Sequence, residues 1–364
     1  MKKLEYTIRF VTPAFLGNAE QKAQWRTPSF KALLRQWWRV VKAKELLEKN
    51  VSPNSLHTEI RKHEGRLFGH AWLEKTNDQG KWAMRSRVLL RLNPWASGGL
   101  AHWDRSGIGQ VSDGKQSVPA DVYLGYGPVS PKSKPKNKPQ PYLTNPPAIG
   151  AREKAVLSIM FPEECQQEMH DTLTLINVFG AIGSRSRNGW GSLQLDEALE
   201  LDANEIGAFT RPFEPCFELD WPHAIGRDTK PLLWKTDISP SWQTVVNTLG
   251  QVRKDMRMEV KGLGSGRMIK ATHILGYPVT KNDNPRWGSK ERLASQIRFK
   301  VMQTAEGHAG LITHVPCAVP ERLLILLDEQ DRRWVRDNQA RIWQEIHKVL
   351  DGMTSIDRIE GSIQ

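Results

Sequence analysis

The chain contains 364 residues, of which 39% are hydrophobic and 25% are charged, with 14 tryptophans and a formal net charge of +12. No stretch approaches the roughly 20 apolar residues that a membrane-spanning helix needs, so a membrane is not expected as a partner. A single hydrophobic core stops growing at roughly 250 to 300 residues, and the length therefore favours two domains. The basic balance favours an anionic partner, usually nucleic acid, unless the charge has no role.

The three cysteines, Cys165, Cys216 and Cys317, lie far apart and form no CxxC pair. A zinc site is therefore not expected, and an odd, sparse count suits a reducing cytoplasm. We expect all three to be buried and unreactive. The first ten residues lack the apolar core of a signal peptide and are predicted to form a strand.

The first elements predicted are a strand over residues 4–12 and a helix over 27–49, with Thr27 as N-cap and Pro28 in the first turn. Apolar residues at helical spacing form one face of this helix, and Lys31, Arg35, Arg39 and Lys42 follow another. The basic face is either a solvated surface or a row of phosphate ligands. Trp38 could either pack in the core or stack on a base.

Further strands are expected over 86–95, 146–161 and 189–201, with a helix over 165–183 before the last of them. Residues 96–119 show no strong periodicity, and the Lys/Pro-rich stretch 127–141 reads as an exposed insertion. The order predicts an α+β, ferredoxin-like (RRM-like) βαββαβ domain with insertions, spanning 1-205.

The second half repeats this order without a clear internal repeat. Strands are predicted over 216–223, 291–304, 310–316 and 322–329. A helix is predicted over 240–259, a basic glycine-rich loop over 261–270 and a closing helix over 332–350, with Trp334, Ile342, Trp343 and Ile346 facing inward. We therefore expect a second ferredoxin-like domain in tandem, spanning 206-364.

The stretch GAIGSRSRNGWGSLQL, residues 180–195, is the most distinctive motif. It follows a predicted helix and precedes a strand, which fits neither a Walker loop nor a dinucleotide fingerprint. Glycines allow the backbone to approach a ligand or a neighbouring segment closely. Arg185 and Arg187 could thus grip an RNA backbone, or the segment could be a tight connection with two solvated arginines.

No catalytic motif such as HExxH or GxSxG is present. His57, His63 and His70 follow the first helix at spacings of six and seven, which do not place them on one helical face. One of them could serve as the general base of a metal-independent ribonuclease, or all could be ordinary surface histidines. We expect no catalytic residue, no metal site and no cofactor.

The segment TPAFLGNAEQKAQWRTPSFKALLRQWWR, with RLFGHAW, YLGYGP and the glycine-rich stretch, resembles the RAMP proteins of CRISPR effector complexes. HILGYPV and RLASQIRFKV are similar to second-half segments of the same family, although Gln296 stands where the family often has proline. The likeness covers most of the chain and is greatest to the RAMP subunit that caps one end of the type III-B (Cmr) complex.

The resemblance implies two tandem ferredoxin-like domains in a non-catalytic, cytoplasmic RNA-binding subunit of an antiviral ribonucleoprotein. Its partners would be the 3′ region of the CRISPR guide RNA, the target RNA, and the other RAMP subunits of the effector complex. The residues expected to bind RNA are Arg26, Lys31, Arg35, Arg39, Arg185, Arg187, Lys261, Arg267 and Lys270. The glycine-rich loop would contribute Gly180, Gly183, Gly189 and Gly191.

Two alternatives remain open. A RAMP endoribonuclease that processes CRISPR repeat RNA without metal would share the fold and the glycine-rich loop. A protein-only scaffold would use the tryptophans to dock partner subunits.

Overall fold

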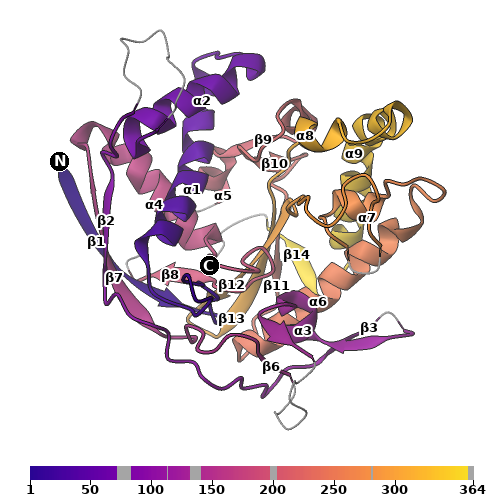
Figure 1. Ribbon diagram of the computed structural model, residues 1–364, viewed down its shortest axis with the longest axis horizontal. Coiled ribbons are helices and arrows are strands. Elements are labelled where there is room, and N and C mark those ends of the chain that lie inside the picture. Colours follow the sequence, from indigo (N-terminus) through magenta and orange to yellow (C-terminus); the bar gives the residue numbers. More distant parts are fainter. Residues whose placement is uncertain (72–82, 113, 132–140, 197–202, 280–281, 360–364) are drawn as a thin grey trace. The chain divides into compact units, whose positions relative to one another are not determined.

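The computed structural model describes residues 1–359 apart from 72–82, 113, 132–140, 197–202 and 280–281 (Figure 1). The chain divides into two compact units. Unit 1 comprises Met1–Ala101, Asn145–Ser184 and Gly191–Leu201. Unit 2 comprises His102–Thr144, Arg185–Trp190 and Asp202–Gln364.

These units are discontinuous along the chain, which differs from the contiguous boundaries 1-205 and 206-364. Residues 185–190 and the described parts of 102–144 belong to unit 2 because they pack on its central elements. Asn247 of the long helix α6 (Trp242–Glu259) accepts a hydrogen bond from the Gly109 N–H, at 2.7 Å. The Phe299 N–H donates to the Arg187 carbonyl, at 3.0 Å. Most of the Lys/Pro-rich insertion predicted at 127–141 lies outside the described residues.

Unit 1 contains an antiparallel sheet with the strand order β2-β7-β1-β8. The strands are β1 (Lys2–Phe10), β2 (Leu89–Asn93), β7 (Lys154–Phe161) and β8 (Leu193–Leu195). Helix α1 (Thr27–Glu48) follows β1, and helix α4 (Gln166–Phe179) follows β7 (Figure 1). Without the insertions, the order along the chain is therefore βαββαβ.

The core of unit 1 lies between this sheet and the pair α1 and α4. Strand β7 alternates buried and exposed residues, so one face of the sheet is apolar and the other polar. Phe30, Leu33 and Leu34 of α1 and Leu173 and Ile176 of α4 meet that apolar face. Helix α2 (Pro53–Phe68), which the sequence did not predict, packs on α1, and Phe68 meets the Trp38 ring edge-on at 5.4 Å. The predicted apolar face of α1 is confirmed.

Unit 2 repeats the same topology with different residues. Its antiparallel sheet has the order β12-β13-β11-β14. The strands are β11 (Leu233–Thr236), β12 (Ile297–Gln303), β13 (His308–His314) and β14 (Ile356–Arg358). Helix α6 (Trp242–Glu259) follows β11, and helix α9 (Glu329–Asp351) follows β13. This is again βαββαβ, with the second, third, first and fourth strands as neighbours.

Short elements complete both units. Between β2 and β7 lie β3 (Gln110–Ser112), β4 (Ser117–Pro119), α3 (Ala120–Gly125), β5 (Val129–Ser130) and β6 (Tyr142–Leu143). Then come η1 (Glu163–Cys165), α5 (Ala203–Gly207), β9 (Thr210–Pro212), η2 (Glu214–Glu218) and β10 (Ile225–Arg227). Unit 2 also holds η3 (Val260–Gly262), α7 (Ala271–Ile274) and α8 (Glu321–Leu324).

Two predicted strands are wrong. Residues 216–223 begin in the 3₁₀-helix η2. Residues 322–329 begin in α8. A short apolar run does not distinguish a strand from a buried helical turn, and Pro320 suits the N-terminal side of a helix. Trp334, expected to face inward, is only half-buried, whereas Ile342, Trp343 and Ile346 are buried. Within the described residues, no helix is long and apolar enough to cross a membrane.

Candidate nucleic-acid interface

Two arginines of the basic face of α1 share one carboxylate. Arg35 Nε donates to Glu64 Oε1 of α2 at 2.5 Å, and Arg39 Nε donates to Oε2 at 2.6 Å. Glu64 is 8% exposed. Burial acts to raise the pKa of Glu64, but the hydrogen bonds and charges of Arg39 and Arg35 outweigh it and lower the pKa. The two arginines therefore hold α2 against α1, and one carboxylate compensates half of their charge.

The other cations of unit 1 differ in accessibility. Lys42 is buried and forms ion pairs with Glu45 and Glu168. Lys31 is half-buried, and burial, followed by the charge of Arg35, lowers its pKa. Arg26 donates to the Gly17 carbonyl at 3.1 Å. Positive charge is therefore in excess on this face of α1, because there is one carboxylate, Glu64, for three cations, Lys31, Arg35 and Arg39.

Trp38 packs in the core. Its side chain is 1% exposed, and its indole N–H donates to Glu168 Oε2 at 2.9 Å. A base has no access to this ring, so of the two expected roles the structure shows the packing one.

The glycine-rich stretch is shared between the two units. Gly180, Gly183 and Gly191 belong to unit 1, and Gly189 belongs to unit 2. Gly191 has φ +64°, and a Cβ there would lie 2.0 Å from the Ile182 carbonyl oxygen. The Gly191 carbonyl in turn accepts a hydrogen bond from the Ile182 N–H at 2.9 Å. Glycine is required at this position because the chain closes on itself, not because a ligand approaches.

Arg185 and Arg187 lie in the part of the stretch that belongs to unit 2. The Arg185 side chain donates to the Tyr126 carbonyl at 2.8 Å, and Arg187 donates to the Ser295 carbonyl at 2.9 Å. Asn188 forms a parallel bridge with Phe299 and donates to the Leu124 carbonyl. The segment thus lies along the β12 edge of the sheet. Arg185 also adopts φ +62°, which is uncommon for a residue with a side chain.

Further arginines lie near this pair, and we call Arg185, Arg187, Arg253, Arg257 and Arg298 the loop arginine cluster. Burial first, and then the charge of Arg257, lower the pKa of Arg253 to about 10. Burial first, and then the charge of Arg187, lower the pKa of Arg298 to about 9. Burial also lowers the pKa of Arg185 and of Arg187. These like charges are close enough to repel one another.

Sequence reasoning missed three members of the loop arginine cluster. Arg253 and Arg257 lie four residues apart on α6, so they share a helical face, and this spacing is a signal that could have been read. Arg298 lies on β12. Its proximity to Arg187 could not be predicted from the sequence, because 111 positions separate the two residues.

Tryptophans anchor the cluster's segment. Trp190 is fully buried, and its ring lies 5.4 Å from that of Trp103 and 5.8 Å from that of Trp242. Trp103 in turn donates to the buried Asp121 carboxylate at 2.8 Å. The contacts of these three rings hold the segment in place, and Trp190, which is fully buried, is closed to a ligand.

The basic loop of unit 2 carries the remaining predicted ligands. Lys261 is exposed. Arg267 forms an ion pair with Asp331 at 3.2 Å. Lys270 donates to the Asn282 side chain at 3.1 Å. The structure does not bring these three residues together in a common contact.

The predicted candidates for general base lie on or after α2. His57 and His63 belong to the helix, and His70 pairs through its backbone with Met84. Burial, and then the charge of Lys42, lower the pKa of His63. Within the described ranges, no three His, Cys, Asp or Glu side chains are arranged to hold a metal ion.

Unit 2 contains a buried polar network around Gln296, where the resembled family often has proline. The Gln296 side chain donates to the Cys317 carbonyl at 2.7 Å, and its Oε1 lies 3.1 Å from His314 Nε2. The other ring nitrogen of His314 lies 2.8 Å from His347 Nε2. Burial, and then the neighbouring His347, hold the pKa of His314 well below its ordinary value. The glutamine therefore ties β12 to β13 through side-chain bonds that proline cannot form.

The cysteines agree in part with expectation. Cys216 and Cys317 are buried, and burial raises the pKa of each to about 12, which disfavours the reactive thiolate. Cys165 is half-buried, which corrects the expectation that all three are buried.

No family model and no curated protein matches the chain. Among solved structures, apo Cmr1 from Pyrococcus furiosus aligns with a TM-score of 0.47 and 14% identity, over 86% of this chain and 88% of that one. A chain of the type III-B Cmr-beta complex bound to cognate target RNA and AMPPnP, state 2, in the presence of ssDNA, aligns with a TM-score of 0.47. Its identity is 11%, over 95% and 98% of the two chains.

A chain of the Cmr-beta complex bound to cognate target RNA aligns with a TM-score of 0.43 and 11% identity, over 94% and 99% of the chains. These structures are of the class that the sequence motifs resemble. At TM-scores below 0.5 they carry no argument about individual residues, and the site rests on its own geometry.

Proposed function

We propose that the chain is a non-catalytic RNA-binding subunit of a type III CRISPR effector complex, contacting the guide RNA, the target RNA or both at one end of the complex. We also propose that both sheets are ferredoxin-like, since each has βαββαβ order and the same strand neighbours. The motif resemblance and the net charge of +12 support the class.

One observation carries the RNA-binding role. Arg185 and Arg187 bond to backbone carbonyls, and neither forms an ion pair with any carboxylate in the described part of the chain. Carbonyls orient a guanidinium without neutralising it. The neighbouring arginines repel rather than compensate, so the cluster concentrates positive potential. A phosphate would relieve this repulsion, and a guanidinium binds phosphate through two hydrogen bonds.

Charge reversal tests the role. The variant Arg185→Glu/Arg187→Glu is titrated with single-stranded guide RNA at several salt concentrations. Each lost phosphate contact should reduce the slope of log affinity against log salt by about 0.7. We therefore expect the slope to fall by roughly 1.4. The control is Arg341→Glu, which reverses an exposed arginine on α9. If both variants bind RNA as the wild type does, the scaffold alternative is preferred.

The endoribonuclease alternative needs a separate assay. Purified chain is incubated with CRISPR repeat RNA in EDTA, and we expect no cleavage. Site-specific cleavage that disappears when His57, His63 or His70 is replaced would establish the enzyme instead.

A further inference from the structure

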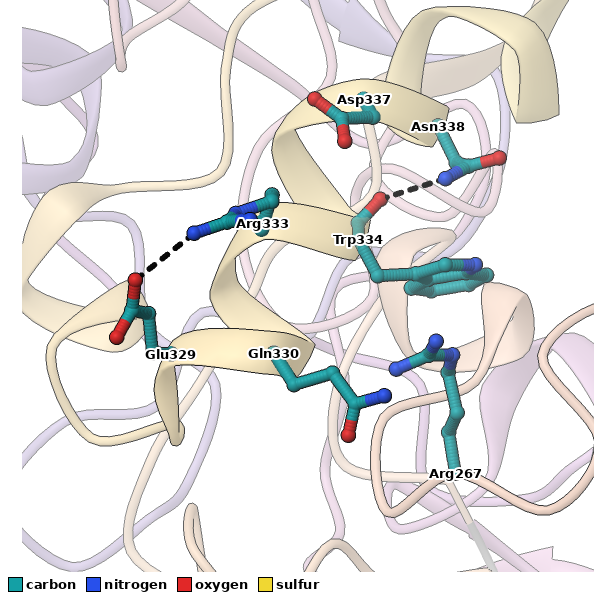
Figure 2. A pocket seen from close by; sticks show the side chains of 7 residues that line it. All are labelled: Arg267, Glu329, Gln330, Arg333, Trp334, Asp337 and Asn338. Atoms are coloured by element: carbon teal, nitrogen blue, oxygen red, sulfur yellow. Dashed lines mark hydrogen bonds and ion pairs between the residues drawn. The ribbon is translucent and has the colours of Figure 1, made fainter.

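A cavity of about 460 Å³ lies in unit 2 where the basic loop 261–270 meets the first turns of α9 (Figure 2). Arg267 of the loop and residues of α9 between Glu329 and Asn338 line it. Arg267 was expected to be a phosphate ligand, but its surroundings differ from those of the loop arginine cluster.

Arg267 is held against an aromatic ring. Its guanidinium carbon lies 5.7 Å from the centroid of the Trp334 ring, and Nη1 donates to Asp331 Oδ1 at 3.2 Å. Asp331 is 5% exposed, and its backbone N–H donates to the Asp328 side chain that caps α9. The guanidinium of Arg267 is therefore held by the buried Asp331 carboxylate and lies over the Trp334 ring.

The loop is shaped around the same ring. Gly264 has φ +77°, and a Cβ there would lie 2.9 Å from Trp334 Cη2. Only glycine lets the loop backbone pass so close to the indole in this conformation. The indole thus supports the Arg267 guanidinium on one side, and the guanidinium, which is partly exposed, lines the cavity.

Both arginines around the cavity are already paired with carboxylates. Arg267 pairs with Asp331, and Arg333 pairs with Glu329 at 2.9 Å. Asp337 adds a further carboxylate at the rim. Since the cations are already compensated, a phosphate gains little here, in contrast to the loop arginine cluster.

The polar groups around the cavity suit the edge of a ring. Asn338 donates through Nδ2 to the Trp334 carbonyl at 2.9 Å, which leaves its side-chain oxygen as an acceptor (Figure 2). Gln330 extends toward Arg267, and Asp337 supplies carboxylate oxygens (Figure 2). A planar guanidinium with hydrogen-bond acceptors around the same cavity fits a planar, neutral ligand that carries amino groups on its edge.

We propose that this cavity binds one unpaired nucleobase, stacked on the Arg267–Trp334 pair and bonded at its amino edge by Asp337 and Asn338. This inference rests on the proposed RNA-binding function. Bases stack on arginine planes and on indole faces, and stacking tolerates sequence variation because every base presents a π face.

The test compares two chains of equal length and charge. Fluorescence anisotropy measures the binding of the full-length protein to octaadenylate and to an eight-unit abasic ribose-phosphate chain. We expect the wild type to bind octaadenylate about tenfold more tightly than the abasic chain. Octauridylate, whose base lacks an exocyclic amino group, should bind more weakly than octaadenylate.

Two variants and one control localise the effect. Arg267→Lys keeps the charge and loses the planar face, and Trp334→Leu removes the aromatic ring. Each should abolish most of the preference for octaadenylate, without changing the salt dependence. Arg336→Lys, an exposed arginine on α9 paired with Glu321, should retain it. If Trp334→Leu fails to fold by circular dichroism, Arg267→Lys decides, since it keeps a positive charge beside Asp331 and leaves the Trp334 ring in place.

The possible outcomes distinguish a failure of the proposed base site from a failure of the proposed RNA-binding function. If the abasic chain binds as tightly as octaadenylate, the base site is wrong while backbone binding stands. If the preference survives both variants, or octauridylate binds best, the base site is likewise wrong. If no chain binds at all, the RNA-binding function fails and this inference fails with it.

Discussion

Units 1 and 2 have the same topology, but the arginines of α1 and the arginines of the glycine-rich stretch meet different partners. In unit 1, Glu64 accepts hydrogen bonds from Arg35 and Arg39, and Lys42 is matched by Glu45 and Glu168. In unit 2, the loop arginines bond to carbonyls.

The histidine pair of unit 2 is also held uncharged by burial, which lowers the pKa of both rings. The same fold can therefore use arginine to join two helices or to present a charge. Which of the two occurs depends on whether a carboxylate lies within reach.

The largest expected effect on stability is at Gly191, and Gly189 of the same stretch serves as the comparison. In Gly191→Ala the new Cβ meets the Ile182 carbonyl oxygen at 2.0 Å, so we expect a loss of roughly 4 kcal/mol in the free energy of unfolding. Gly189→Ala also has a positive φ, but its Cβ finds its nearest neighbour, Leu249, at 3.5 Å, so about 1 kcal/mol should be lost. Urea denaturation measures both. Equal losses would mean that strain in φ, not the carbonyl contact, dominates.

Acid should destabilise the chain through the neutral histidines of unit 2. Burial first, and then the charge of Arg358, lower the pKa of His347 to about 4, partly opposed by Asp228 and Asp351. Between pH 6.5 and about 4 the unfolded chain binds a proton at this ring that the folded chain does not, so stability falls as pH falls. The difference corresponds to about 3 kcal/mol.

Thermal melts across this range measure the acid effect. His347→Gln should show a shallower decline than the wild type. His170→Gln, which replaces an exposed histidine of α4, should match the wild type. A decline of the same slope in all three proteins would remove His347 as its source.

Removing the Glu64 carboxylate tests how much its pairing with Arg35 and Arg39, the arginine clamp of unit 1, stabilises the fold. Glu64→Gln leaves two partly exposed guanidinium groups without their counter-charge, and we expect a loss of about 2 kcal/mol in the free energy of unfolding. The matched control is Glu59→Gln on the same helix, where the carboxylate pairs with Lys62 at the surface. Its effect should stay below about 0.5 kcal/mol. Similar melting temperatures for both variants would argue against the clamp.

The smallest effect on stability is expected at the loop arginines. Since Arg185 and Arg187 have no carboxylate partner in the described residues, Arg185→Gln/Arg187→Gln should change the free energy of unfolding by less than about 0.5 kcal/mol. RNA affinity at low salt should nevertheless fall. A large loss of stability would show that these side chains act chiefly as connectors within unit 2.

Much of each unit could be predicted along the chain because local pattern decides helices and strands. The apolar spacing of Phe30, Leu33, Trp37 and Val41 predicted α1, and alternation predicted β1 and β12. The order of these elements favoured βαββαβ twice. Short apolar runs such as residues 322–329 failed, because their period is too brief to separate a strand from a helix.

Only tertiary structure decided which charges are compensated. The sequence by itself determined that Arg35, Arg39, Arg185 and Arg187 lie on basic segments, and on that level all four were equal candidates for phosphate. The fold places Glu64 against the first two, although 25 residues separate it from the nearer. It places carbonyls of Tyr126 and Ser295 against the other two. A side chain's net electrostatic role depends on partners within a few ångströms, and those partners come from distant parts of the chain.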